Sequence, residues 1–412
     1  LGALSGFQGR ITGLGRGDWD VAAVDRSGLM QLNGTLDLST GGDLNLNAGD
    51  RIASASGLRV GAATLNNAGE LASDGYLTLD LGGNLNNSGT LRASKNLSTT
   101  ANNISNSGLT QAGERLSLLA TDSIRNAQGG IIAGKNVTAI ALTGDIRNER
   151  TITQEARSGR NFSQLTSVVD KAAGIEASND LTLSAGRDIQ NIGGSLKAGG
   201  DASLSAGQDL IIASAEAENG QMRKDKRHFW SSTSTTQYGS DVQVGGDLAA
   251  EAGRDLEVIA SKVKAGGDVD LLAERDVMIG AAANESSSEY RYDRGSKKKI
   301  NQENSTVRQQ MAEIEAGGDL LVGAGGDMTL LASRLKSAGD VQLVAEGDLS
   351  LLPEANQDYR FYEMSEKKKG SFGSSKSKKI KEENSSVRQQ GVEIEAGGDL
   401  LLSTEANLTL AA

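Results

Sequence analysis

The tripeptide Asn67-Ala68-Gly69 decides the fold, because it recurs along the first third of the chain at a nearly constant distance. It returns as Asn87-Ser88-Gly89, Asn106-Ser107-Gly108 and Asn126-Ala127-Gln128-Gly129, with Asn148 as a weaker copy. Successive Asn residues of this motif are 20, 19, 20 and 22 positions apart. A fixed period of about 20 residues is typical of a solenoid, in which each repeat forms one turn of a coil.

A second motif, Gly-x-Asp followed by an apolar residue, continues this period through the rest of the chain. Its aspartates alternate steps of 8 and 13 residues, which together make 21. They form three cassettes of four: Asp180, Asp188, Asp201 and Asp209; Asp247, Asp255, Asp268 and Asp276; and Asp319, Asp327, Asp340 and Asp348. Asp399 and Asn407 begin a further cassette with the same step of 8. Both parts of the chain therefore share one structural period.

Short alternating runs such as 77–81 and 181–183 lie between these turn motifs. Alternation places every second side chain on one face of a strand. Strands this short are not stable alone, but each can pair with its copy one turn away. We therefore expect an all-β fold, a right-handed parallel β-helix with about 20–21 residues per rung and about 16 rungs. An α-helical solenoid is disfavoured, because long stretches with a period of 3.6 are missing.

The composition agrees with a narrow coil. The chain has 53 Gly, one Pro, no Cys and one His, and 3% of its residues are aromatic. Leu, Ile, Val and Ala fill a narrow interior, while Gly suits corners that need positive φ or close backbone approach. Asn and Asp cap such turns, and Asn residues one period apart are expected to stack into a ladder. We favour turn capping over calcium binding for the Asp residues, since calcium-binding rolls repeat every nine residues. No cofactor or metal is expected.

Three insertions interrupt the cassettes, whose last and first Asp residues are 38, 43 and 51 positions apart. We place the insertions at about 216–240, 284–310 and 355–390. The chain is accordingly divided into regular repeats at 1–148, a transition segment at 149–176, and cassettes with insertions at 177–412. In the second insertion, an alternating run at 288–293, a polar turn at 295–299 and a second run at 304–308 predict a β-hairpin that projects from the rod.

The insertions differ from the rod in chemistry. They hold 9 of the chain's 13 aromatic residues, and their 19 basic and 12 acidic residues give a net charge of +7 within a chain of net charge −11. Basic residues interleaved with aromatic rings suit anionic sugars, phosphates or a membrane interface. The alternative is that the Lys runs only keep exposed hairpin edges from pairing. The candidate envelope- or anion-binding residues are Arg223, Lys224, Arg227, Phe229, Trp230, Tyr290, Arg291, Tyr292, Lys297, Lys298, Lys299, Tyr359, Arg360, Phe361, Tyr362, Lys367, Lys368, Lys369 and Phe372.

Several runs carry a family resemblance. Ala-Gly-Arg-Asp-Ile at 185–189, Lys-Ala-Gly-Gly-Asp at 197–201 and 264–268, and Ala-Gly-Arg-Asp-Leu at 252–256 resemble the repeats of filamentous haemagglutinin. Similar repeats occur in CdiA-type exoproteins of contact-dependent growth inhibition, which are effectors of two-partner secretion. The Asn-x-Gly repeats are similar to the family's first repeat class, and the cassettes with insertions to its second.

This resemblance implies a secreted β-helical rod at the surface of a Gram-negative bacterium, exported through an outer-membrane transporter. It implies stalk and delivery functions, because the second repeat class is associated with moving a toxin across the outer membrane of the target cell. The expected partners are that membrane or a receptor on it, and the filament is expected to be monomeric. The start at Leu1 has no Met or signal-peptide pattern, and neither a secretion domain nor a toxin is recognisable, so we expect a piece of a longer protein.

Two alternative functions remain open. The first is a host-directed adhesin that binds acidic glycans. The second is a β-helical enzyme that cleaves acidic polysaccharides, but this needs clustered carboxylates in a groove, and the acids here follow the repeat. Arg16-Gly17-Asp18 is an integrin-type tripeptide that also fits an ordinary corner, and His228 has no partner identifiable from the sequence. The acidic net charge and the extracellular setting disfavour a nucleic-acid partner.

Overall fold

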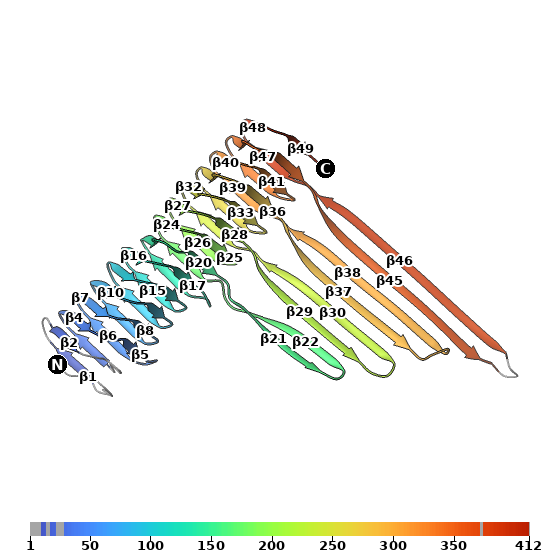
Figure 1. The fold of residues 1–412 in the computed structure, drawn as a ribbon, viewed down its shortest axis with the longest axis horizontal. Coiled ribbons are helices and arrows are strands. Elements are labelled where there is room, and N and C mark those ends of the chain that lie inside the picture. The colour runs from blue at the N-terminus through green and yellow to red at the C-terminus, as the bar shows by residue number, and fades with distance from the viewer. Residues whose placement is uncertain (1–9, 14–16, 22–28, 371–373, 412) are drawn as a thin grey trace.

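The structure is a computed structural model that describes residues 10–13, 17–21, 29–370 and 374–411. Within these residues the chain forms a rod of three long parallel sheets, here called sheets I, II and III, and an antiparallel sheet that projects from one side of the rod (Figure 1). The expected all-β class and parallel β-helix are confirmed. Of the Arg16-Gly17-Asp18 motif, Arg16 lies outside the described residues.

The strands of the rod follow one another in the order I, II, III within each rung. Sheet I consists of β1 (Arg10–Gly13), β3 (Leu29–Leu32), β6 (Arg51–Ser54), β9 (Glu70–Ser73), β12 (Thr90–Ala93), β15 (Leu109–Ala112), β18 (Ile131–Gly134), β23 (Gly174–Ala177), β26 (Ser195–Ala198), β31 (Asp241–Val244), β34 (Lys262–Ala265), β39 (Glu313–Ala316), β42 (Arg334–Ser337) and β47 (Glu393–Ala396). Sheet II consists of β2 (Gly17–Val21), β4 (Thr35–Thr40), β7 (Gly57–Ala62), β10 (Tyr76–Leu81), β13 (Leu97–Ala101), β16 (Arg115–Ala120), β19 (Asn136–Ala141), β24 (Leu181–Ala185), β27 (Ala202–Ala206), β32 (Leu248–Ala252), β35 (Val269–Ala273), β40 (Leu320–Ala324), β43 (Val341–Ala345) and β48 (Leu400–Thr404). Sheet III consists of β5 (Leu44–Leu46), β8 (Leu65–Asn67), β11 (Leu85–Asn87), β14 (Ile104–Asn106), β17 (Ile124–Asn126), β20 (Ile146–Glu149), β25 (Ile189–Ile192), β28 (Leu210–Ala213), β33 (Leu256–Ile259), β36 (Val277–Gly280), β41 (Met328–Leu331), β44 (Leu349–Leu352) and β49 (Leu408–Leu410).

The projecting sheet, called the hairpin sheet from here on, has eight strands in chain order. They are β21 (Ile152–Gly159), β22 (Phe162–Val169), β29 (Ala215–Lys224), β30 (His228–Tyr238), β37 (Ala282–Asp293), β38 (Lys298–Gln310), β45 (Glu354–Lys369) and β46 (Ser375–Gln390). The first hairpin, β21–β22, lies in the segment 149–176, where the sequence analysis expected none. Sheets I and II each hold 14 strands in the described residues, fewer than the expected number of rungs, partly because this hairpin uses residues assigned to the rod.

In-register stacking of small aliphatic side chains forms the core. Leu77 on sheet II pairs with Leu58 of the preceding rung and Leu97 of the next, and all three side chains are almost completely buried. The same alternation repeats along the described rod, so that every second residue of a strand contacts its counterparts one rung away. Such an interior needs no large rings, which explains the scarcity of aromatic residues in the rod.

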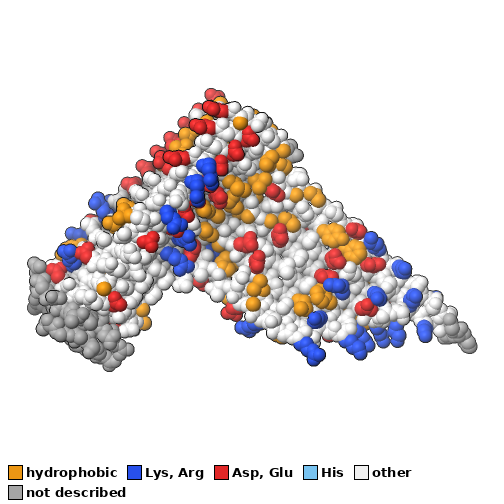
Figure 2. All heavy atoms as spheres, in the orientation of Figure 1, with side chains coloured by type: hydrophobic (Ala, Val, Ile, Leu, Met, Phe, Trp, Pro, Cys, Tyr) orange, Lys and Arg blue, Asp and Glu red, His pale blue; other side chains and the backbone are white. Residues whose placement is uncertain are grey.

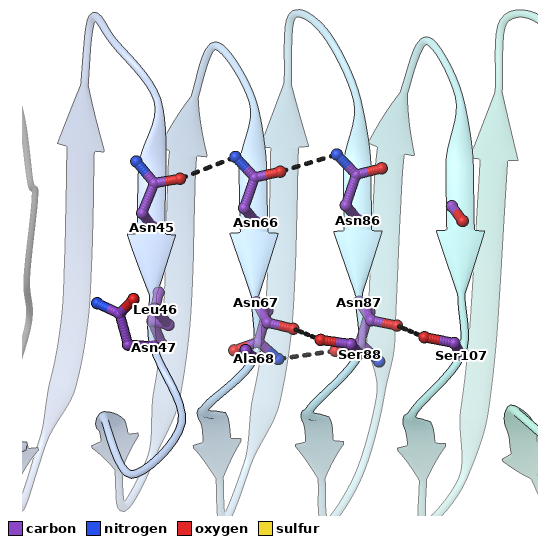
Figure 3. A pocket seen from close by; sticks show the side chains of 11 residues that line it. Asn45, Leu46, Asn47, Asn66, Asn67, Ala68, Asn86, Asn87, Ser88 and Ser107 are labelled. Carbon is purple, nitrogen blue, oxygen red and sulfur yellow. Dashed lines mark hydrogen bonds between the residues drawn. The ribbon is translucent and has the colours of Figure 1, made fainter.

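Asparagine ladders occupy the corner between sheets III and I, as expected. The Asn67 amide donates to Asn87 Oδ1 (2.7 Å), and Asn87 donates to Asn106 Oδ1 (2.7 Å). The buried ladder continues with the same bond through Asn126, Asn148 and Asn191. A second, more exposed ladder joins Asn45, Asn66 and Asn86 on the same strands (Figure 3). Beyond Asn191 the inner position passes to aliphatic residues, beginning with Ile212.

Aspartate ladders occupy the other two corners. Between sheets I and II, the backbone N–H of Asp201 donates to Asp180 Oδ1 (3.2 Å) and that of Asp247 donates to Asp201 Oδ1 (3.0 Å). Between sheets II and III, the N–H of Asp209 donates to Asp188 Oδ1 in the same way (3.2 Å). The first ladder continues through Asp268, Asp319, Asp340 and Asp399, and the second through Asp255, Asp276, Asp327, Asp348 and Asn407. The expected turn-capping role of these aspartates is confirmed.

Candidate functional site

The hairpin sheet is the candidate functional site, and its strand spacing matches that of the rod. All four hairpins leave the rod between a strand of sheet III and the following strand of sheet I. Two rungs separate each hairpin from the next; for example, β31–β33 and β34–β36 lie between β30 and β37. Strands in a sheet and rungs in a rod are both about 4.8 Å apart. Two rungs therefore advance the chain by the width of one hairpin, and neighbouring hairpins meet edge to edge.

Hydrogen bonds fix the base of this sheet to the rod. Gln237 is nearly buried, and its amide donates to Glu216 Oε2 (2.7 Å) while it accepts from the Ser214 hydroxyl (2.8 Å). The Gln310 amide donates to the Ala260 carbonyl oxygen on the rod (2.7 Å). Arg150 donates to the Asp170 carbonyl oxygen (2.9 Å), and its guanidinium lies 5.2 Å from the ring centroid of Tyr238. These contacts hold the hairpins at a fixed position on one corner.

One face of the hairpin sheet carries a row of aromatic side chains from different hairpins. Residues directly opposite each other on paired strands project to the same face. Trp230 is opposite Tyr290, which is opposite Gln302, which is opposite Tyr362. A second row on the same face, two residues closer to the tips, holds His228, Tyr292, Ile300, Met364 and Ile380. We call this side the aromatic face.

Ring contacts and partial burial are consistent with this arrangement. The His228 ring centroid lies 4.9 Å from that of Tyr292 and 6.4 Å from that of Tyr290. Trp230, Tyr290, Tyr292 and Tyr362 are only half-buried, because no other element of the described chain lies over the distal part of the sheet (Figure 1). Cross-strand aromatic pairs stabilise the sheet, and the same rings leave an apolar strip open to a partner.

The opposite face pairs cations with rings. The guanidinium of Arg291 lies 4.5 Å from the ring centroid of Phe229, and Lys381 Nζ lies 5.5 Å from that of Phe361. Tyr359 and Phe361 project to this face together, two residues apart on β45. The pKa of Tyr359 is raised, first by loss of hydration and then by the negative charge of Glu383. Tyr359 therefore remains a neutral hydrogen-bonding group at neutral pH.

Basic side chains gather toward the tips of the longest hairpins (Figure 2). Lys368 is directly opposite Lys376, and like charges in this position destabilise a hairpin; the Glu366 carboxylate, 3.5 Å from Lys368 Nζ, offsets part of this effect. Lys298 and Lys299 lie on β38, which pairs with β37 on one side and β45 on the other. Protection of a free edge therefore does not explain these two lysines, since β38 has no free edge.

Acidic residues near the turns have structural partners. Asp225 accepts the backbone N–H groups of Arg227 and His228 (both 2.7 Å), which lower the pKa of its carboxyl to about 2. Its carboxylate also contacts His228 Nδ1 at 2.9 Å. Asp293 pairs with Lys299 at 2.9 Å, and that lysine lowers the pKa of Asp293. These carboxyl groups are ionised at neutral pH, unlike a general acid, which needs a raised pKa.

The structure brings most of the predicted residues together on two faces of one sheet. On the aromatic face lie Arg223, Trp230, Tyr290, Tyr292, Lys298, Arg360, Tyr362 and Lys368. On the opposite face lie Lys224, Phe229, Arg291, Lys299, Tyr359, Phe361, Lys367 and Lys369. Arg227 and Lys297 lie in the turns of their hairpins, and Phe372 lies outside the described residues.

Sequence reasoning missed the aliphatic part of the aromatic face. Ile300, Met364 and Ile380 extend its second row across three neighbouring strands. Phe162 of the unexpected first hairpin is opposite Arg223 and extends the first row to β22. The duplicated pairs Lys299-Ile300 and Lys379-Ile380 could have revealed it. Adjacent residues of a strand project to opposite faces, so an Ile next to an exposed Lys indicates an apolar position on the face opposite that Lys.

Two surface hollows of the described chain are lined mainly by polar residues. One is lined by the outer Asn ladder and by Ser88 and Ser107 (Figure 3). Another lies over the hairpin sheet among Ser and Thr side chains, including Ser232, Thr233 and Ser287. Within the described residues, no group of three or more His, Asp or Glu side chains is placed to hold a metal ion. In the part of the chain that the structure describes, no helix is long and apolar enough to cross a membrane.

Comparison with known proteins identifies the repeat type. Models described as hemagglutinin repeat match residues 155–231 and 221–371, and models described as haemagglutinin repeat match 15–89, 58–149 and 376–412. The chain is 35% identical to a 16S rRNA endonuclease CdiA of Enterobacter cloacae over 79% of its own length. It is 32% identical to a tRNA nuclease CdiA of Escherichia coli over 80%, and 29% identical to a deoxyribonuclease CdiA of Dickeya dadantii over 65%. No solved structure matches.

The chain spans only a small part of these relatives, 10% of the first two and 8% of the third. Their names describe different nuclease activities, whereas the part that they share with this chain is repeat sequence. The nuclease activity of the relatives therefore resides outside the matched region. Because of its repeats, its parallel rod and this similarity over most of its length, the chain belongs to the haemagglutinin-repeat family and is homologous to the repeat region of CdiA proteins.

Proposed function

We propose that this chain is a non-enzymatic rod segment of a CdiA-type exoprotein, and that its hairpin sheet engages the outer membrane of a target bacterium during toxin delivery. The observation that carries the proposal is the pairing, on one projecting sheet, of an aromatic face with lysine-rich tips. Half-exposed rings suit the interfacial region of a membrane, and lysines suit its phosphate groups.

The rod and the sheet have separate roles in this proposal. Residues 1–148 serve as a spacer, because regular rungs without hairpins occupy that part of the described chain. The cassettes at 177–412 present the hairpins at one corner, in one direction and at one spacing (Figure 1). The family consists of surface exoproteins that are typically secreted by Gram-negative bacteria in a two-partner secretion context. Export through an outer-membrane transporter and contact with a target-cell receptor are part of the proposal.

The test is made in a full-length CdiA exoprotein that carries this segment. The three longest hairpins are each replaced by a short Gly-Ser turn, and export, surface display, attachment to target cells and growth inhibition are measured. We expect export and display to remain and growth inhibition to be lost. If growth inhibition persists while binding to acidic glycans is lost, the delivery role is wrong and the adhesin function replaces it.

A narrower variant separates charge from shape. Lys367→Gln, Lys368→Gln and Lys369→Gln remove three charges from the tip of the third hairpin. The matched control is Lys262→Gln, Lys264→Gln and Lys336→Gln, which removes three charges from rod lysines that pair with Glu313, Glu315 and Glu395. We expect the tip variant to reduce toxin delivery and the rod variant to leave it unchanged. Equal loss in both variants would contradict the proposed role of the tips.

A further inference from the structure

The outer edge of β46 carries the same residues that dock one hairpin onto the next inside the sheet. At the junction of β30 and β37, the Gln237 backbone N–H donates to Asn284 Oδ1 (2.8 Å) and its amide donates to the Ala283 carbonyl oxygen (3.3 Å). At the junction of β38 and β45, Gln309 makes the same two bonds to Asn356 Oδ1 (2.7 Å) and the Ala355 carbonyl oxygen (3.2 Å). A Gln on one strand and an Ala-Asn pair on the next thus form a repeated clamp.

The junction between β22 and β29 uses a related bond, and the junction between β38 and β45 adds a charged contact. The Ser167 backbone N–H donates to Asn219 Oδ1 (2.9 Å) between β22 and β29. Between β38 and β45, Arg308 donates to the Gln357 carbonyl oxygen (3.0 Å) and to Asp358 Oδ1 (2.5 Å). All three junctions therefore place an Asn side chain of the incoming hairpin on a backbone N–H of the preceding one.

The strand β46 repeats the docking residues of β38. The run Val307-Arg308-Gln309-Gln310 recurs as Val387-Arg388-Gln389-Gln390. Beyond its pairing with β45, the described chain gives neither Arg388 nor Gln389 a side-chain hydrogen bond or ion pair. Val387 is 59% exposed, whereas its counterpart Val307, paired with Gln357 of the docked strand, is half-buried. The edge of β46 has the chemistry of an occupied junction without its occupant.

We propose that the outer edge of β46 is a docking site for the first strand of another hairpin of this repeat class. The occupant is an antiparallel strand with an Ala-Asn pair against Gln389 and, two residues after the Asn, an Asp opposite Ser386, where the Arg388 side chain can reach it as Arg308 reaches Asp358. Such a strand reaches this edge when its hairpin leaves the rod two rungs beyond β45–β46, since every observed junction has that spacing. Backbone pairing supplies affinity, and the clamp residues set the register.

A peptide with the sequence of Glu354–Lys369 is the probe, because it is the strand that occupies the equivalent edge of β38. It is added to the complete chain, and amide hydrogen exchange along β46 and the anisotropy of the labelled peptide are measured. We expect slowed exchange at Val387 and Gln389, whose N–H groups correspond to those that face the docked strand on β38. Unchanged exchange at peptide concentrations of about 1 mM would overturn the proposal.

Two charge reversals on β46 test the chemistry of the site. Arg388→Glu places a carboxylate against the peptide's Asp at position 358 and should weaken binding about tenfold or more. Lys379→Glu is the matched control, because its counterpart Lys299 is opposite Ser365, an uncharged residue. Equal affinity of both variants would contradict the clamp. Protection of β46 that depends on protein concentration without peptide would mean that a second copy of the chain is the occupant, and would overturn the proposed one.

Discussion

A single carboxylate oxygen connects each rung to the next at the aspartate corners. Asp201 Oδ1 accepts the N–H of Asp247, and the ladder continues in the same way along the cassettes. Where glycine immediately precedes the next Asp, it lies against this oxygen, so that a Cβ atom on Gly246 would collide with Asp201 Oδ1. Close approach, rather than positive φ, is therefore the reason for glycine at this position.

The substitution Gly246→Ala tests this contact. The new Cβ should displace the Asp201 carboxylate and destabilise the adjacent rungs by about 1–3 kcal/mol. The matched control is Gly82→Ala, where a Cβ would meet nothing within 4 Å, and its effect should stay within about 0.5 kcal/mol. Local stability is measured by hydrogen exchange of β32 and β10, because solenoids do not always unfold in one step. Similar losses in the two variants would show that the carboxylate contact is unimportant.

Arginine replaces glycine at some corners and makes stability depend on pH. Arg254 donates to Asp209 Oδ1 (2.6 Å) on the preceding rung, and this bond is the main cause of the lowered pKa of Asp209. A lowered carboxyl pKa stabilises the fold above the ordinary value of 3.8, and that stabilisation is lost as pH falls through the folded-state value. Asp209→Asn should therefore lower the thermal midpoint at pH 7 and have little effect near pH 2.

The control for this pH dependence is Asp270→Asn. Burial, and then the charge of Asp268, raise the pKa of Asp270, which gives its carboxylate the opposite effect on stability. This variant should raise the thermal midpoint at pH 7 and lose its advantage as the carboxyl of the parent protein becomes protonated. The thermal midpoint of each protein is measured by circular dichroism as a function of pH. If the two variants and the parent chain show the same pH dependence, these pKa assignments are wrong.

At the scale of elements, the spacing of two rungs per hairpin determines whether the projecting strands form one sheet. Deletion of residues 241–261 removes one rung between β30 and β37 and should shift these strands by about 4.8 Å relative to each other. We expect the β30–β37 pairing to open, with faster amide exchange on both strands. Deletion of 241–312 removes two rungs and one hairpin, and should bring β30 next to β45 with the sheet intact. Continued protection, in the one-rung variant, of the β37 N–H groups that face β30 would refute the spacing argument.

Much of the fold could be predicted from the sequence, because its restraints are periodic. The 20-residue step between Asn67 and Asn87 predicted both the coil and an Asn ladder. The first hairpin was missed because 152–169 has few aromatic or basic residues, although Asp145 and Asp188 are separated by the same kind of long gap as the other cassettes. That gap was the available signal.

The joining of the hairpins into one sheet was harder to predict. It depends on contacts between residues about fifty positions apart, such as Gln237 with Asn284. No local sequence pattern indicates that pairing. The number of Asp residues does: each rung has two, so a cassette of four Asp residues corresponds to two rungs between successive hairpins. The candidate residues were therefore identified by type from the sequence, while their division between two faces required the strand register.

At the scale of the whole molecule, charge and aromatic residues are separated between the rod and the sheet. The rod pairs its cations with acids, as in Lys264 with Glu315 (2.9 Å) and Lys336 with Glu395 (3.0 Å). Near the tips, Lys368 and Lys376 are opposite each other, although Lys368 also contacts Glu366 (3.5 Å). The hairpins also lengthen along the chain, from 8 residues per strand in β21–β22 to 16 in β45–β46. The most basic part of the sheet therefore extends farthest from the rod (Figure 2).

Sedimentation with outer-membrane vesicles tests the central claim most directly, namely that the hairpin sheet engages a target envelope. Vesicles from target bacteria are mixed with the purified chain at low and high salt, and bound protein is measured. We predict binding that weakens with salt and falls about tenfold or more in the Lys367, Lys368 and Lys369 to Gln variant, while the matched rod variant binds like the parent. Absence of binding by the parent chain, or equal binding by all three proteins, would contradict the account.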